Sequence, residues 1–291
     1  MKAFFIQLVK VFGLIIIFLF LLDLVYTKIY NHPTHARSKV SWLKNIKKNQ
    51  EFDFAIFGSS RGFYHLNPKQ IETETGLYGI NLAYPGSNNF EIKLMVKEFL
   101  NLQQVKKIFI QVDNQYNKEY IDNIAVIPWM PYIKEESIYK EIKAVDNKAF
   151  YKKNIPFYRY MIYDSKLGFR ELIMNLIKPN KFEQNNGFAN IYGDMQQSIN
   201  KSLIFELEDK KNKQLEEIVA ICKKEDIELY FFTAPYYKTS LNTNVLKKNL
   251  PNYADFSKSI NQVEFFRDFS HLNSLGAKKF TEIFSSAYFK S

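Results

Sequence analysis

The sequence has few cysteines and few histidines, which limits the chemistry open to it. Cys222 is the single cysteine among 291 residues, so neither an intramolecular disulfide nor a metal site of paired cysteines can form. It follows Leu215 and Ile218 at helical spacing, which predicts a small buried hydrophobic residue. We expect no metal ion and no cofactor. Four histidines are candidate bases: His32, His35, His65 and His271.

The sequence also has no compact cluster of basic residues and no recognised nucleic-acid-binding motif. Its formal net charge is nevertheless +10, and almost all of that charge comes from lysine. Such a charge suits an anionic membrane surface, an anionic polymer or nucleic acid. An AT-rich coding sequence, which favours Lys, Asn, Ile, Phe and Tyr, is the alternative explanation. We predict no nucleic-acid partner.

One long apolar segment lies near the N-terminus. Residues Val11 to Leu22 are apolar apart from Gly13, and an extended stretch from Leu8 to Tyr26 contains Lys10 and Asp23. A membrane-spanning helix needs about 20 residues, so this stretch is just long enough. A cleaved signal peptide is the alternative, but no small-x-small cleavage site follows. We predict an uncleaved signal anchor over residues 1–27, followed by a polar juxtamembrane linker over residues 28–50.

The basic residues on the two sides of this anchor bear on its orientation in the membrane. Basic residues after the apolar segment outnumber Lys2 and Lys10 before it; they are Lys28, Arg37, Lys39, Lys44, Lys47 and Lys48. The positive-inside rule therefore predicts a cytoplasmic C-terminal side. Long domains can be translocated despite flanking charge. We expect a single-pass protein with an extracytoplasmic (periplasmic or cell-surface) domain, against the charge count.

The rest of the chain, residues 51–291, alternates apolar strands with amphipathic helices. Strands are predicted at 54–57, 78–82, 105–112, 227–233 and 263–266, and helices at 68–75, from 88, at 203–224 and at 274–288. Residues about 117–200 break this alternation and are predicted to form an inserted helical and loop region. The alternation predicts an α/β domain with a parallel sheet covered by helices on both faces.

Polar residues follow several of these predicted strands. In parallel sheets, ligands bind outside the carboxyl ends of the strands. The residues that would meet at this edge are Ser60, Gly86, Asp113, Asn114, Pro235, Asp268 and His271.

These residues predict an acyl-transfer site. A serine hydroxyl needs a base to accept its proton, and His271 can be that base for Ser60. Asp268, three residues before His271, can orient the imidazole. Backbone N–H groups of Ser60 and Gly86 are candidate donors to the oxyanion. His65 is a rival base without a neighbouring carboxylate.

Each of these residues also has a simpler interpretation. Gly-Ser-Ser after a strand is commonly an ordinary turn, and Asp268 is a residue type that favours turns and helix caps. Arg61 is a candidate for binding an anionic group, or a residue that caps a loop.

Three short motifs resemble the SGNH (GDSL-like) hydrolase superfamily. Gly58-Ser59-Ser60 is similar to its first block, Gly86 to its glycine block, and Asp268-Phe-Ser-His271 to its last block. The chain resembles in particular the membrane-anchored envelope branch that includes the teichoic-acid D-alanylation protein DltD and the alginate O-acetylation proteins. This resemblance covers about residues 52–116 and 226–288. It implies a three-layer flavodoxin-like (SGNH-type) fold, with Ser60 rather than Ser59 as nucleophile.

The third block departs from this family. The family often has Gly-x-Asn-Asp, whose Asn side chain lies in the oxyanion hole, whereas this chain has Gln111-Val-Asp113-Asn114. Asn114 is a candidate donor in a different register. Loss of one such donor lowers transition-state stabilisation by about 2.7–4 kcal/mol.

Two functions are compatible with this sequence. The first is a serine esterase or O-acyltransferase that acts on a cell-envelope polysaccharide or glycoconjugate, at the membrane and with a membrane-bound acyl-transfer partner. The second is a non-catalytic, anchored binding or assembly protein on an SGNH-like scaffold.

Overall fold

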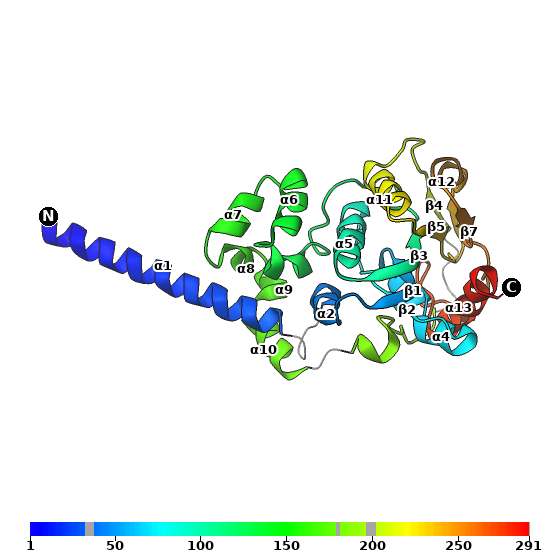
Figure 1. Ribbon diagram of the computed structural model, residues 1–291, viewed down its shortest axis with the longest axis horizontal. Coiled ribbons are helices and arrows are strands. Elements are labelled where there is room, and N and C mark those ends of the chain that lie inside the picture. Colours follow the sequence, from blue (N-terminus) through cyan, green and yellow to red (C-terminus); the bar gives the residue numbers. More distant parts are fainter. Residues whose placement is uncertain (33–37, 179–180, 196–201, 291) are drawn as a thin grey trace. The chain divides into compact units, whose positions relative to one another are not determined.

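The structure is a computed structural model that describes residues 1–32, 38–178, 181–195 and 202–290. Contacts within the chain divide it into two units. Residues 1–45 and 126–180 form the first, which we call the helical unit, and residues 46–125 and 181–291 form the second, which we call the α/β unit. Figure 1 labels most of the helices and strands of both units.

The α/β unit is built on a parallel sheet of five strands in the order β2-β1-β3-β5-β7. The bounds are Glu51–Phe57 (β1), Gly79–Asn81 (β2), Gln104–Gln111 (β3), Glu228–Thr233 (β5) and Tyr253–Asp255 (β7). In the central pair β1 and β3, Phe54 lies opposite Lys107 and Phe57 opposite Ile110. The second half of each strand is buried, because helices cover both faces of the sheet. The predicted parallel α/β fold is thereby confirmed.

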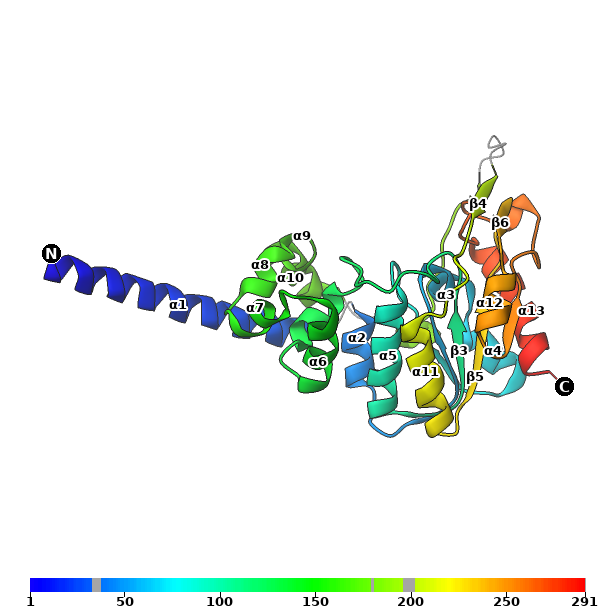
Figure 2. The same ribbon diagram turned by 90° about the horizontal axis from the view of Figure 1, so that it is seen from above.

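Figure 2 shows two layers of helices with this sheet between them. Helices α5 (Asn89–Leu102) and α11 (Lys213–Lys224) cover one face, and α4 (Pro68–Thr75) and α13 (Ser274–Tyr288) cover the other. On the α13 side, aromatic rings from the sheet and the helix make the core, as when Phe232 meets Phe284 with ring centroids 5.1 Å apart. On the α5 side, Phe57 packs against Phe99. The shorter elements of the unit are α3 (Ser60–His65), η2 (Glu183–Asn185), α12 (Asn244–Asn249), η3 (Val263–Phe265) and the paired strands β4 (Leu203–Phe205) and β6 (Thr239–Leu241).

The helical unit begins with α1 (Lys2–Tyr30), which is long and apolar enough to cross a membrane by length and composition. Its other elements are α2 (Lys39–Asn45), η1 (Ile127–Tyr132), α6 (Glu136–Val145), α7 (Ala149–Asn154), α8 (Tyr158–Ile162), α9 (Asp164–Leu167) and α10 (Phe169–Ile177). Most of α1 is exposed, but Asp23, Tyr26 and Tyr30 near its C-terminal end are buried within the unit. The last turns of α1 are therefore part of the packed core of this unit.

Several predicted elements differ from the structure. Residues 39–45, predicted as linker, form α2 with Trp42 and Leu43 buried; residues 33–37 of that linker lie outside the described residues. The helix predicted at 203–224 is instead β4 followed by α11, which begins only at Lys213 where Asn212 caps it. The predicted strand at 263–266 is a 3-10 helix. The segment grouped with the N-terminus is 126–180, narrower than the predicted insertion at about 117–200.

Candidate active site

Ser60 lies at the first position of α3, just beyond the end of β1. The turn between them needs glycine, because Gly58 has a φ of +148° and a Cβ there would lie 2.7 Å from the Cβ of Gln111. The Gln111 side chain crosses this space and accepts hydrogen bonds from the backbone N–H and the hydroxyl of Ser59, at 2.9 and 2.8 Å. The Ser59 hydroxyl is thus hydrogen-bonded to Gln111, whereas the Ser60 hydroxyl is directed to His271.

The three residues predicted as a triad lie together. Ser60 Oγ is 2.8 Å from His271 Nε2, and His271 Nδ1 is 2.9 Å from Asp268 Oδ2. A carboxylate only accepts hydrogen bonds, so Nδ1 carries the proton and Nε2 is left to accept the hydroxyl proton of Ser60. This arrangement has the geometry required to activate a serine.

Asp268 also holds the turn in which His271 lies. Its Oδ1 accepts hydrogen bonds from the backbone N–H groups of Ser270 and His271, at 2.8 and 2.9 Å. Burial raises the pKa of this carboxyl, but the hydrogen bond and charge of His271 and the two backbone donors outweigh burial and lower the pKa overall. Asp268 is therefore ionised at neutral pH, as an orienting carboxylate must be.

His65, the rival base, has a different place in the structure. It lies at the end of α3, fully buried, and its Nε2 accepts a hydrogen bond of 3.0 Å from the backbone N–H of Leu272. Burial, followed by the charges of Arg61 and His271, lowers its pKa well below the usual value. His65 is thus a neutral residue that fixes the backbone next to His271. No local sequence pattern indicates this contact, since its partner is 207 residues away.

Arg61, the candidate for binding an anionic group or for capping a loop, already has an anionic partner within the chain. Arg61 is buried and forms an ion pair with Asp113, which is buried too. Its guanidinium also donates to the backbone carbonyls of Ala234 and Pro235 and stacks on the ring of Tyr236, 3.3 Å from the centroid. Arg61 therefore links the ends of three strands, β1, β3 and β5, behind the nucleophile.

Gln111 is a site residue that the sequence analysis did not identify. Its side chain contacts Ser59 through Oε1 and donates from Nε2 to Asp113 Oδ2 at 2.6 Å. A polar residue within the apolar strand 108–112 is the signal that could have indicated it.

The oxyanion donors stay predictions. Gly86 lies in the turn after β2 with a φ of +83°, and this turn is joined to the Gly58 turn by a hydrogen bond from Tyr84 N–H to Gly58 O of 3.0 Å. Asn114 is exposed in the turn after β3. As the first residue of α3, Ser60 has a backbone N–H without an acceptor inside the helix.

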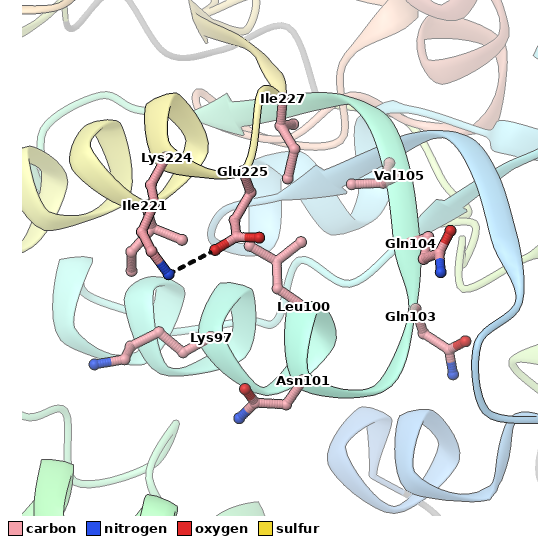
Figure 3. A pocket seen from close by; sticks show the side chains of 10 residues that line it. All are labelled: Lys97, Leu100, Asn101, Gln103, Gln104, Val105, Ile221, Lys224, Glu225 and Ile227. Carbon is pink, nitrogen blue, oxygen red and sulfur yellow. Dashed lines mark hydrogen bonds and ion pairs between the residues drawn. The ribbon is translucent and has the colours of Figure 1, made fainter.

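A surface pocket of about 590 Å³ lies at the opposite edge of the sheet (Figure 3). It is lined by residues at the start of β3 and the end of α11, among them Gln104 and Lys224, whereas Ser60 and Asp113 follow the carboxyl ends of their strands. Two of the residues that line the pocket, Lys224 and Glu225, form an ion pair of 3.0 Å. The pocket is thus not part of the triad site. Within the described ranges, no group of three or more His, Cys, Asp or Glu side chains is placed to hold a metal ion.

Comparison with family models gave no match, and no curated protein matches the chain. Among solved structures, one described as "a putative platelet activating factor from Streptococcus pneumonia" is similar to 99% of this chain over 99% of its own length. The two share 11% sequence identity and superpose with a TM-score of 0.40. A likeness at this level supports no conclusion about the fold or activity of this chain.

Proposed function

We propose that this chain is a membrane-anchored serine esterase or O-acyltransferase of the SGNH type. The observation that carries the proposal is the pair of hydrogen bonds from Ser60 to His271 and from His271 to Asp268, at 2.8 and 2.9 Å. Ser60 is 211 residues from His271 in the sequence, and the two meet at the carboxyl edge of a parallel sheet, where such folds bind their ligands.

The proposed reaction has two half-steps. His271 Nε2 accepts the hydroxyl proton as Ser60 Oγ forms a bond to the acyl carbon of the substrate. The bond from that carbon to the leaving oxygen then breaks, and the leaving oxygen takes the proton from His271. An acceptor hydroxyl next gives its proton to His271 and attacks the acyl carbon; the bond from that carbon to Ser60 Oγ then breaks, and Oγ takes the proton from His271. Water as acceptor makes the chain an esterase, and a sugar hydroxyl makes it a transferase.

The proposed substrate is a cell-envelope polysaccharide or glycoconjugate. The apolar helix α1 supports this choice, because an anchored domain stays near lipid-linked or nascent polymer and near a membrane-bound acyl-transfer partner. In this proposal the α/β unit is extracytoplasmic. A reporter fused to the C-terminus tests the placement, and a cytoplasmic signal would contradict it.

Hydrolysis of 4-nitrophenyl acetate by the detergent-solubilised full chain tests the activity. Ser60→Ala and His271→Ala are expected to lower kcat/KM by at least about 1000-fold, because either change removes the activated nucleophile. Ser59→Ala is the matched control. It loses one hydrogen bond to Gln111 and is expected to stay within about tenfold of the original activity. Unchanged hydrolysis in Ser60→Ala would refute the proposal.

A non-catalytic binding or assembly protein is the second candidate. The observation that favours it is that Asn114, the candidate for the third oxyanion donor, is exposed in the turn after β3. This candidate predicts that Ser60→Ala keeps the cellular role, while deletion of residues 1–22 abolishes it.

A further inference from the structure

Helix α10 exposes an apolar stripe. Phe169, Ile173 and Ile177 are 69%, 40% and 65% exposed, and with Leu176 they occupy positions i, i+4, i+7 and i+8 of one helix face. Its inward face carries Leu172 and Asn175, which are buried. A surface helix of a soluble protein normally turns its apolar stripe toward the core. Here the apolar stripe faces outward, as in helices that lie in the interface of a bilayer.

A second exposed apolar group lies around α8. Met161 is 57% exposed, and Ile155 and Ile162 are exposed as well. This segment is held against α1, because Arg159 forms an ion pair of 2.8 Å with Asp23 and the Phe157 ring packs edge-on against Tyr26. The segment that carries these exposed residues thus contacts the last turns of α1.

These two groups continue the apolar surface of α1. Leu24 and Val25, close to the buried end of α1, are themselves exposed. Helix α10 packs on α1, and Tyr30 Oη donates a hydrogen bond of 3.4 Å to Gly168 O, directly before Phe169. The two exposed apolar groups therefore lie on segments that contact the last turns of α1.

Basic side chains border this surface. Lys166, Arg170 and Lys178 are exposed. The carboxylates of residues 158–178 are Asp164, which is exposed, and Glu171, which is partly buried and lies 3.7 Å from Arg170. An apolar face with a basic border binds bilayers that contain anionic lipids, because it combines burial of apolar area with attraction to the headgroups.

We infer that the exposed faces of α8 and α10 lie in the headgroup–acyl boundary of an anionic leaflet, so that the helical unit rests on the bilayer that α1 enters. The helical unit is thus a membrane-surface module in addition to the anchor. This inference requires insertion of α1 but not catalysis by Ser60. The quenching experiment can therefore fail while the hydrolysis experiment succeeds, and the reverse.

Fluorescence quenching in vesicles of phosphatidylcholine and phosphatidylglycerol tests the inference with the full chain. Cysteines introduced by Ile173→Cys and Met161→Cys carry an environment-sensitive dye; Cys222 is buried and its pKa is raised to about 12, so it does not react. Lys140→Cys, exposed on α6 of the same unit, is the aqueous control, and Ile15→Cys within α1 is the bilayer control.

Lipids with a nitroxide on the acyl chain are expected to quench the dyes at 161 and 173 at least about twofold more than the dye at 140. Adding Arg170→Glu and Lys178→Glu is expected to weaken quenching at 173. Equal quenching at 140, 161 and 173 would overturn the inference. Dyes shielded from aqueous iodide but not quenched by lipid would overturn it in favour of a protein partner, and an unquenched dye at 15 would overturn it together with the anchor.

Discussion

Asp268 performs two tasks with one carboxylate. Its Oδ2 accepts the Nδ1 proton of His271, and its Oδ1 closes the turn that carries the same histidine. Because the residues are three positions apart, this pair forms locally and needs no long-range assembly. The position of Ser60 against His271 does need such assembly, and buried residues behind it, such as Arg61 and His65, provide it.

His65 makes the stability of the fold depend on pH. Its pKa is lowered in the folded state, chiefly by burial, so the unfolded chain binds a proton below about 6.5 that the folded chain does not. The contribution of His65 to the free energy of unfolding is fully present above that pH and is lost as the pH falls. Between pH 7.5 and 5.5 the free energy of unfolding is expected to drop by about 1.4 kcal/mol more than in His65→Gln.

Chemical unfolding of the detergent-solubilised full chain at both pH values measures this difference. The glutamine variant is a suitable reference, because its amide oxygen can still accept the Leu272 N–H while it carries no titrating group. If the free energy of unfolding of the original chain and of His65→Gln changed equally with pH, His65 would not be a buried neutral residue.

Helix α3 is short, yet it serves the site at both ends. Ser60 begins it and points to His271; His65 ends it and holds Leu272. Its entry depends on Gly58, where the backbone conformation and the crossing Gln111 side chain leave no room for a Cβ.

Gly58→Ala is therefore expected to lower both stability and activity. The new Cβ would be overpacked against Gln111, which is expected to lower the free energy of unfolding by about 1–3 kcal/mol in addition to the cost of an alanine at positive φ. Gly76→Ala is the matched control, because its φ is +75° but a Cβ there meets nothing within 4 Å. We expect only about 1–2 kcal/mol of destabilisation in that control. Equal losses in the two variants would contradict the crowding at Gly58.

The elements show where sequence reasoning succeeds. The strands at β1, β3 and β5 were predictable because each is a short apolar run, and α5 because Asn88 and Glu91 form a capping box. The proximity of Ser60 and His271 was predicted because parallel strands end at one edge, but only Ser60 follows a strand, since His271 follows the 3-10 helix η3. The roles of Arg61 and Gln111 were not, because a charged or polar side chain after a strand gives no sign whether it faces solvent or is buried.

At the scale of the whole molecule, α1 is more than an anchor. Asp23 lies within its apolar sequence, yet it accepts hydrogen bonds from Arg159, Lys134 and the Phe157 N–H at 2.8–3.0 Å. Removal of α1 would therefore take away part of the core of the helical unit as well as the membrane segment.

Asp23→Asn is expected to destabilise the helical unit by about 3–5 kcal/mol, because it leaves the buried Arg159 without a countercharge. Lys134→Met is the control, since Lys134 is half exposed and its loss is expected to change stability by about 0–1 kcal/mol. Limited proteolysis of residues 126–178 in the full chain measures both. Equal protection of Asp23→Asn and the original chain would contradict an integral role for α1.

The central claim is that Ser60 is an activated nucleophile, and labelling by a fluorophosphonate tests it most directly. Ser60 Oγ would bond to phosphorus, fluoride would leave, and His271 would take the proton. Peptide mass mapping of the labelled full chain is expected to place one probe on Ser60, and His271→Ala is expected to lose it. Labelling at Ser59, or none on the folded chain, would contradict the claim.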